Sequence, residues 1–159
     1  MIDIIDKAQS RILDNITINK SEMNEEILID NAGKAIAFHI IENFQDPFNS
    51  KFLCISGKGK NGLDAIVTNF YLKKNNICSD LFIIEPEMII SDYYNDYINE
   101  YKIKSFQDIN LTSYDYIIDG IIGTGLNRDI DGDYLKIIQS LEGFHNIISI
   151  DIPSGVYTD

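Results

Sequence analysis

Short apolar runs alternate along this chain with longer segments of helical spacing. Four runs have the length of buried strands and cover residues 52–55, 81–84, 116–118 and 147–150. Apolar residues spaced every three to four positions predict helices between them at 62–74, 88–101 and 133–141, and before the first run at 3–16 and 24–44. Strands that alternate with helices form a mainly parallel sheet with helices on both faces. The pattern predicts an α/β fold, a Rossmann-like three-layer αβα arrangement with two helices before the first strand.

Two details of the predicted helices concern packing. Gly33 lies inside the second helix, where glycine costs about 1 kcal/mol relative to alanine, so we expect this helix to approach another backbone closely there. In the helix over 133–141, we expect Leu135, Ile138 and Leu141 to point inward.

Three glycine-containing loops follow the first, third and fourth predicted strands, at residues 57–64, 119–129 and 151–155. In a parallel sheet these loops meet at the carboxyl edge, where ligands bind. Gly57, Gly59 and Gly62 have the G-x-G-x-x-G spacing typical of phosphate and dinucleotide sites. One such loop is as easily a structural turn as a phosphate site, but three loops at one edge predict a ligand site.

Composition narrows the possible partners. The 159-residue chain has a net charge of -12, which argues against nucleic-acid or anionic-membrane binding through a basic face. No apolar run is long enough to span a membrane, and the first residues lack the basic start of a signal peptide. Two cysteines are too few for a disulfide framework, and Cys54 is expected to be a small core residue. We expect a cytoplasmic protein.

The loop sequences resemble the YjeF N-terminal domain family, the NAD(P)HX epimerases. Residues 60–65 (KNGLDA) are similar to the family's N-N-G-G-D-G, with Lys60, Leu63 and Ala65 as departures. Residues 119–126 (DGIIGTGL) match its D-A-hydrophobic-F-G-x-G-L segment, and residues 151–155 match its D-I-P-S-G. The resemblance extends to Leu13-Asp14 and Asn31-Ala32-Gly33, so it covers nearly the whole chain.

The resemblance implies interconversion of the R and S forms of hydrated NADH or NADPH, within nicotinamide cofactor repair. Loss of the hydroxyl at C6 of the nicotinamide ring leaves an iminium cation, and water returns on the other face. Asp151 matches the family's substrate-binding aspartate and is the expected catalytic residue, with Asp64 as a second candidate. The expected substrate-binding residues are Lys60, Asn61, Gly62, Leu63, Asp64, Gly123, Thr124, Gly125, Leu126, Asn127, Arg128, Asp129 and Asp151.

The family also binds a potassium ion, and the matching positions here are Asn61, Asp119 and Ser154. All three offer the side-chain oxygen that a hard cation prefers. Where the family has a neutral amide, this chain has Lys60, so the lysine ammonium could weaken or replace the ion.

The resemblance further implies a homodimer and a fused or separate ADP- or ATP-dependent NAD(P)HX dehydratase as partner. We expect residues 1–159 to form a single domain whose C-terminal edge is incomplete relative to the family pattern. Two alternatives remain open. The first is a catalytically degenerate ligand-binding or interaction module of the same fold. The second is a Rossmann NAD-dependent dehydrogenase, in which Glu85, at the end of the second strand, would bind ribose hydroxyls.

Overall fold

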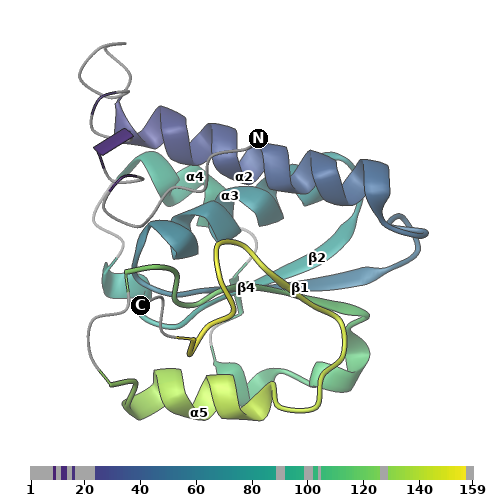
Figure 1. Ribbon diagram of the computed structural model, residues 1–159. Coiled ribbons are helices and arrows are strands. Elements are labelled where there is room, and N and C mark those ends of the chain that lie inside the picture. Colours follow the sequence, from purple (N-terminus) through teal and green to yellow (C-terminus); the bar gives the residue numbers. More distant parts are fainter. Residues whose placement is uncertain are drawn as a thin grey trace, which may run out of the picture.

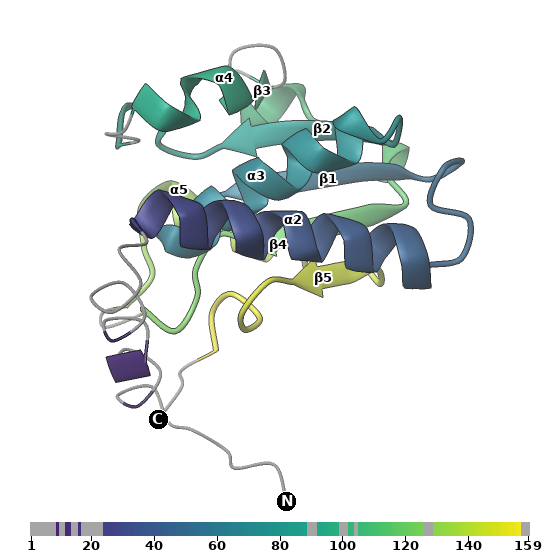
Figure 2. The same cartoon turned by 90° about the horizontal axis from the view of Figure 1, so that it is seen from above.

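Five parallel strands form one sheet in the computed structural model. The structure describes residues 9, 12–13, 16, 24–88, 92–98, 102–103, 105–125 and 129–156. The order across the sheet is β3-β2-β1-β4-β5 (Figure 2). The strands are β1 (Lys51–Ser56), β2 (Cys78–Ile83), β3 (Lys102–Ile103), β4 (Tyr116–Gly120) and β5 (Ile147–Ser149). The four predicted strands are confirmed. The sequence analysis missed β3 because two paired residues leave no apolar run.

Helices cover both faces of the sheet, which confirms the three-layer αβα fold (Figure 1). One face carries α2 (Glu25–Asn43), α3 (Lys60–Lys74) and α4 (Asn95–Ile98), and the other carries α5 (Gly132–Ser140). Short 3-10 turns occupy Pro86–Met88, Asp92–Tyr94, Phe106–Asp108 and Leu111–Ser113. The predicted helix over 3–16 lies mostly outside the described residues, and its described positions 9, 12, 13 and 16 are helical. Among all the residues that the structure describes, no helix is long and apolar enough to cross a membrane.

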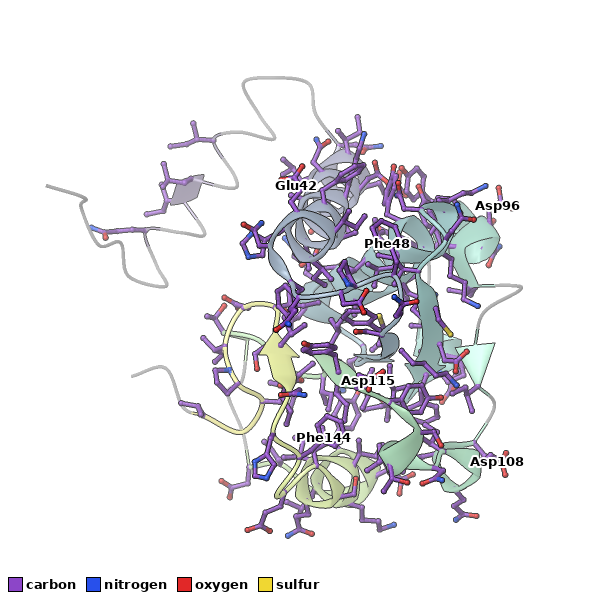
Figure 3. All side chains as sticks on the ribbon, turned by 90° about the vertical axis from the view of Figure 1, so that its right-hand side faces the viewer. Glu42, Phe48, Asp96, Asp108, Asp115 and Phe144 are labelled. Carbon is purple, nitrogen blue, oxygen red and sulfur yellow. The ribbon has the colours of Figure 1, made fainter. Side chains whose placement is uncertain are left out.

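Strand alternation divides the core into two clusters. Phe52 and Cys54 of β1 pack under α2 and α3, whereas Leu53 and Ile55 pack against α5. Figure 3 looks along the sheet, with Glu42 of α2 on one side and Phe144, beyond α5, on the other. Cys54 is fully buried, and this burial raises the pKa of its thiol. Its predicted role as a small core residue is confirmed.

Gly33 is the point of closest approach between α2 and α3. A Cβ atom at Gly33 would lie 2.6 Å from Val67 Cβ and 2.8 Å from the carbonyl oxygen of Asp64. The Thr68 hydroxyl donates hydrogen bonds to the Gly33 carbonyl (3.2 Å) and the Asp64 carbonyl (2.7 Å). The predicted close packing is confirmed, and it holds α2 directly beside the start of α3.

The prediction for α5 was wrong about Leu135, whose side chain is 39% exposed. The face toward the sheet is formed by Tyr134, Ile137, Ile138 and Leu141, which follow the i, i+3, i+4, i+7 spacing. Leu135 lies off this stripe, so it points toward solvent although it is apolar.

The single helix predicted over 88–101 is also not confirmed. The described part consists of one 3-10 turn (Asp92–Tyr94) and one short α-helix (Asn95–Ile98). Asp, Tyr, Asn and Ile all have modest helix propensity, so tertiary packing decides the conformation of this segment. Tyr94 and Ile98 are its buried anchors.

The strand order locates the natural ligand crevice of this fold. From β1 the chain runs outward to β2 and β3, then crosses back to place β4 on the other side of β1. Loops that leave the carboxyl ends of β1 and β4 therefore diverge and open a crevice between them. The loops after β1 and β4 contain two of the three predicted glycine segments, and the third follows β5 next to them.

Candidate functional site

The turn between β1 and α3 has no room for side chains at two of its glycines. A Cβ atom at Gly57 would lie 1.9 Å from the Ile121 carbonyl oxygen, and one at Gly62 would lie 1.9 Å from the Gly57 carbonyl oxygen. The Gly57 amide also donates to the Gly120 carbonyl at 3.1 Å. These contacts hold the first loop tightly against the second, and they explain two of the three glycines of the motif.

Asp119, at the end of β4, ties the second loop to the third. Its buried carboxylate accepts hydrogen bonds from the Ile121 amide (3.1 Å), the Ser149 hydroxyl (3.3 Å), the Ser154 amide (2.9 Å) and the Ser154 hydroxyl (2.6 Å). Ser154 Oγ in turn accepts from the Ile122 amide at 2.9 Å. The three loops are thus one connected structure.

Asn61 lies in the first turn of α3 beside this structure and is 8% exposed. Neither amide atom of its side chain has a hydrogen-bond partner among the described residues. A Cβ atom at Gly123 would lie 3.3 Å from Asn61 Cγ, which places the amide against the second loop. A buried amide oxygen without a donor is a ligand that a hard cation accepts, so Asn61 suits the predicted potassium site, and the shared role of Asp119 and Ser154 stays a prediction. The described residues contain no cluster of His, Cys, Asp or Glu suited to a metal ion.

Asp151 occupies the exposed mouth of the loops. Its Oδ2 accepts a hydrogen bond from the Thr124 amide at 2.8 Å and would lie 2.7 Å from a Cβ atom at Gly123. Glycine at 123 therefore makes space for the carboxylate, and the amide of the next residue orients it. The result is a solvent-facing carboxylate held in one direction.

Asp64 supplies a second carboxyl group with different properties. Burial and, to a smaller extent, the negative charge of Asp151 raise the pKa of Asp64 to about 7, although the positive charge of Lys60 acts to lower it. Its Oδ1 is buried and has no hydrogen-bond partner among the described residues. The site thus contains one largely buried carboxyl group with a raised pKa and one carboxyl group that faces solvent.

Each of the three residues that depart from the family pattern, Lys60, Leu63 and Ala65, contacts a neighbouring element. Lys60 Nζ lies 2.5 Å from Glu25 Oε1 at the start of α2. Leu63 packs against Ile29 and Val67. Ala65 lies so close to β4 that its Cβ would be 2.5 Å from a Cβ atom at Gly120. The effect of Lys60 on an ion stays a prediction.

Tyr134 is a residue of this edge that the sequence analysis did not identify. Its hydroxyl accepts a hydrogen bond from the Lys58 amide (3.0 Å) and donates one to Glu85 Oε2 (3.1 Å). Glu85, the residue expected to bind ribose hydroxyls in a dehydrogenase, thus accepts a hydrogen bond from α5. No local signal in the sequence pairs a helix residue with a loop 76 positions earlier.

The remaining predicted residues of the second loop are described only in part. Leu126, Asn127 and Arg128 lie outside the described residues. Thr124 binds Asp151 through its amide, and Gly125 and Asp129 are exposed.

Comparisons with known proteins identify relatives over most of the chain. The chain is 31% identical to an NAD(P)H-hydrate epimerase of Lentilactobacillus buchneri, over its full length and 76% of that protein. It is 33% identical, over 84% of its length, to a bifunctional NAD(P)H-hydrate repair enzyme Nnr of Dictyoglomus turgidum. It is 28% identical, over 96% of its length, to the enzyme of the same name of Thermofilum pendens. It spans only 27% and 31%, respectively, of these two bifunctional relatives.

The fold has a counterpart among solved structures. The crystal structure of the yeast protein ynu0 matches with a TM-score of 0.76 at 17% identity, over 97% of this chain and 72% of that one. A family model described as "YjeF-related protein N-terminus" matches residues 25–159, so the chain belongs to that family.

Proposed function

We propose that this protein is an NAD(P)H-hydrate epimerase, which interconverts the R and S forms of hydrated NADH or NADPH. The observation that carries the proposal is the pair of unlike carboxyl groups, Asp64 and Asp151, at the crevice where the glycine loops meet. The names of the relatives support this reading over the binding-module and dehydrogenase alternatives.

The two carboxyl groups suit the two needs of the reaction. Departure of the C6 hydroxyl requires a proton and creates an iminium cation on the nicotinamide ring. Asp64, with a pKa of about 7, can hold that proton at neutral pH. Asp151, oriented by the Thr124 amide, faces the cation with a negative charge and stabilises it. Return of water to the opposite face gives the epimer.

The glycine loops would hold the rest of the nucleotide. The expected contacts come from Lys60, Asn61, Gly62, Leu63 and Asp64 on the first loop and from residues 123–129 on the second. Backbone amides at the start of α3 and the Arg128 side chain suit phosphate oxygens. Asn61, Asp119 and Ser154 would hold a potassium ion, which when bound supplies positive charge beside the phosphates.

Further features of the proposal concern the whole protein. We expect a cytoplasmic homodimer in which residues 1–159 act as one domain. A fused or separate ADP- or ATP-dependent NAD(P)HX dehydratase would consume the S form, as the bifunctional names of two relatives suggest.

The test begins with an equilibrated mixture of R- and S-NADHX. An S-specific dehydratase is added, and consumption of the R form is followed with and without this protein. We expect clear acceleration that is lost in Asp151→Asn. Folded protein that gives no acceleration would overturn the proposal and favour the ligand-binding module.

Potassium has a separate test that does not depend on turnover. Crystals soaked in thallium(I), a potassium mimic, should show anomalous density beside Asn61, Asp119 and Ser154. Asn61→Leu should abolish this density. Full occupancy in the wild type would also contradict replacement of the ion by Lys60.

A further inference from the structure

Tyr94 is the buried residue of the segment that follows β2. Its side chain is 2% exposed, whereas the neighbouring Tyr93 is 38% exposed. The ring packs in one cluster with Ile29 of α2 and with Leu63 and Val67 of α3. Its hydroxyl has no hydrogen-bond partner among the described residues. A buried tyrosine hydroxyl normally has a partner, so this one calls for an explanation.

Asp64 carries the complementary atom. In α3, Asp64 lies one residue after Leu63 and three residues before Val67, and both of these residues pack with Tyr94. Residues three apart are neighbours on a helix surface, so Asp64 lies next to Val67. Its Oδ1 is a buried acceptor without a described donor, and the Tyr94 hydroxyl is a buried donor without a described acceptor.

Charge supports the same placement. Burial raises the pKa of Tyr94, and interactions with Glu26, Tyr93, Asp64 and Glu25 raise it further, so its hydroxyl keeps its proton. The pKa of Asp64 also depends on Asp151 and Lys60. Asp64 therefore interacts both with Tyr94 and with two charged residues of the glycine loops.

We propose that Tyr94 is a positioning residue of the site, whose buried hydroxyl donates a hydrogen bond to the Asp64 carboxyl and holds that carboxyl toward the substrate. The structure records no hydrogen bond between the two groups; we infer that the Asp64 carboxyl turns toward Tyr94, or that one ordered water joins them, when the contact forms. Tyr94 is too deeply buried to touch substrate and acts through Asp64. This inference rests on the proposed epimerase function.

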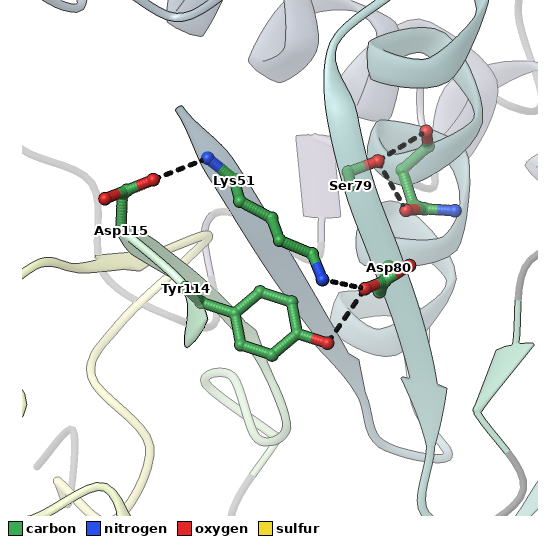
Figure 4. A network of polar contacts seen from close by, with 6 residues as sticks. Lys51, Ser79, Asp80, Tyr114 and Asp115 are labelled. Carbon is green, nitrogen blue, oxygen red and sulfur yellow. Dashed lines mark hydrogen bonds and ion pairs between the residues drawn. The ribbon is translucent and has the colours of Figure 1, made fainter. Parts of the chain in front are cut away.

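The test is Tyr94→Phe, with Tyr114→Phe as the matched control. Both changes remove one hydroxyl, but the Tyr114 hydroxyl donates to Asp80 at 2.8 Å, away from the site (Figure 4). In Tyr94→Phe we expect kcat to fall about tenfold while KM stays within about twofold. The thermal midpoint should fall slightly, because the Asp64 carboxyl loses a buried hydrogen bond. In Tyr114→Phe the thermal midpoint should fall and kcat should not change.

A pH–rate profile separates positioning from packing. A hydrogen bond donated to ionised Asp64 lowers its pKa, so its loss should move the limb near pH 7 upward by about half a unit or more in Tyr94→Phe. Unchanged kcat in Tyr94→Phe overturns the inference. A lower kcat with an unmoved profile also overturns it, because that result means altered packing alone.

Failure of the proposed function would be recognised separately, as a wild-type protein without epimerase activity. The titration of Asp64 would then be followed by carboxyl carbon NMR, with Asp64→Asn to assign the signal. An upward shift of the midpoint in Tyr94→Phe supports the contact, and an unchanged midpoint overturns it.

Discussion

The two edges of the sheet differ in how completely their polar side chains are hydrogen-bonded. At the amino edge, the Lys51 amide donates to Asp115 Oδ2 at 2.7 Å, and Lys51 Nζ lies 3.0 Å from Asp80 Oδ2. Tyr114 donates to the same Asp80 carboxylate (Figure 4). Every charged group of this network has a partner, and the network joins β1, β2 and the start of β4.

At the carboxyl edge, the buried Asp119 carboxylate is fully hydrogen-bonded, but several other buried polar atoms lack partners. The described residues contain five buried side-chain polar atoms without a hydrogen bond, and four of them belong to Asn61, Asp64 and Tyr94. The fifth is Nδ2 of Asn69, between α3 and β2. Each such atom costs about 1–3 kcal/mol of stability. The difference shows that the amino edge satisfies its polar groups, whereas the carboxyl edge leaves buried donors and acceptors unsatisfied at a cost in stability.

The largest expected effect is on catalysis at the carboxyl edge. Asp151→Asn should lower kcat/KM for R-NADHX about a thousandfold, because it removes the charge that faces the iminium cation. Asp133→Asn, a change at a side chain that is 76% exposed on α5, is the control and should keep full activity. Activity retained in Asp151→Asn would contradict the catalytic assignment.

The next effect concerns the loop that shapes this edge. Gly62→Ala should lower the free energy of unfolding by on the order of 3 kcal/mol, because its Cβ would lie 1.9 Å from the Gly57 carbonyl oxygen. Gly125→Ala is the control, since a Cβ atom there would meet no atom of the described residues within 4 Å. Urea unfolding measures the free energy of unfolding of both variants. Equal values would contradict the prediction, because they would show that the loop backbone shifts at little cost.

A pH effect follows from Asp64. Its pKa is about 7 in the folded protein against an ordinary value of 3.8, so between these values the native state holds a proton that the unfolded state loses. Stability should therefore fall as pH rises from about 4 to about 7. Asp64→Asn should gain stability relative to wild type across this window, by on the order of 2 kcal/mol. Thermal unfolding at several pH values measures the difference, and a difference independent of pH would contradict the raised pKa.

The amino edge should respond in the opposite direction. Partial burial tends to raise the pKa of Asp80, but hydrogen bonds from Lys51 and Tyr114 and the charge of Lys51 hold it below its ordinary value. Asp80→Asn should cost about 1 kcal/mol at neutral pH. This loss should shrink as pH falls through the folded pKa of Asp80, because protonation removes the same interactions. Epimerase activity should not change, and a large drop would show that the two edges are coupled.

The smallest effect is expected at Lys60. Its ion pair with Glu25 joins side chains that are 61% and 51% exposed, so Lys60→Asn should change stability by about 0.5 kcal/mol or less. Loss of the lysine charge should raise the pKa of Asp64 slightly, because Lys60 acts to lower it. The pH–rate profile measures this shift, and a downward movement would contradict the assignment.

Much of the framework was predictable because it rests on local signals. The four apolar runs became β1, β2, β4 and β5, and the glycine turn became the β1–α3 connection. Gly33 was recognisable as a close-packing position because glycine in mid-helix is unfavourable without such a reason. The convergence of the three loops followed from the parallel sheet alone.

Other features depended on neighbours distant in sequence. Leu135 and Ile137 are both apolar, and only the docking of α5 on the sheet made Ile137 buried and Leu135 exposed. Tyr94 is one of several tyrosines in an acidic segment, and its sequence context does not distinguish it from Tyr93. Its burial against α2 and α3 does.

The sequence by itself determined the α/β architecture, the edge of the sheet where the site lies and the residues of its three loops. These follow from periodicity and from the backbone requirements of glycine, which are local properties. Only the tertiary structure decided that Asp64 has a pKa of about 7 while Asp151 faces solvent, and that Tyr94 lies buried against α2 and α3. Desolvation and charge interactions depend on which groups folding brings together, so identical aspartate side chains acquire different properties.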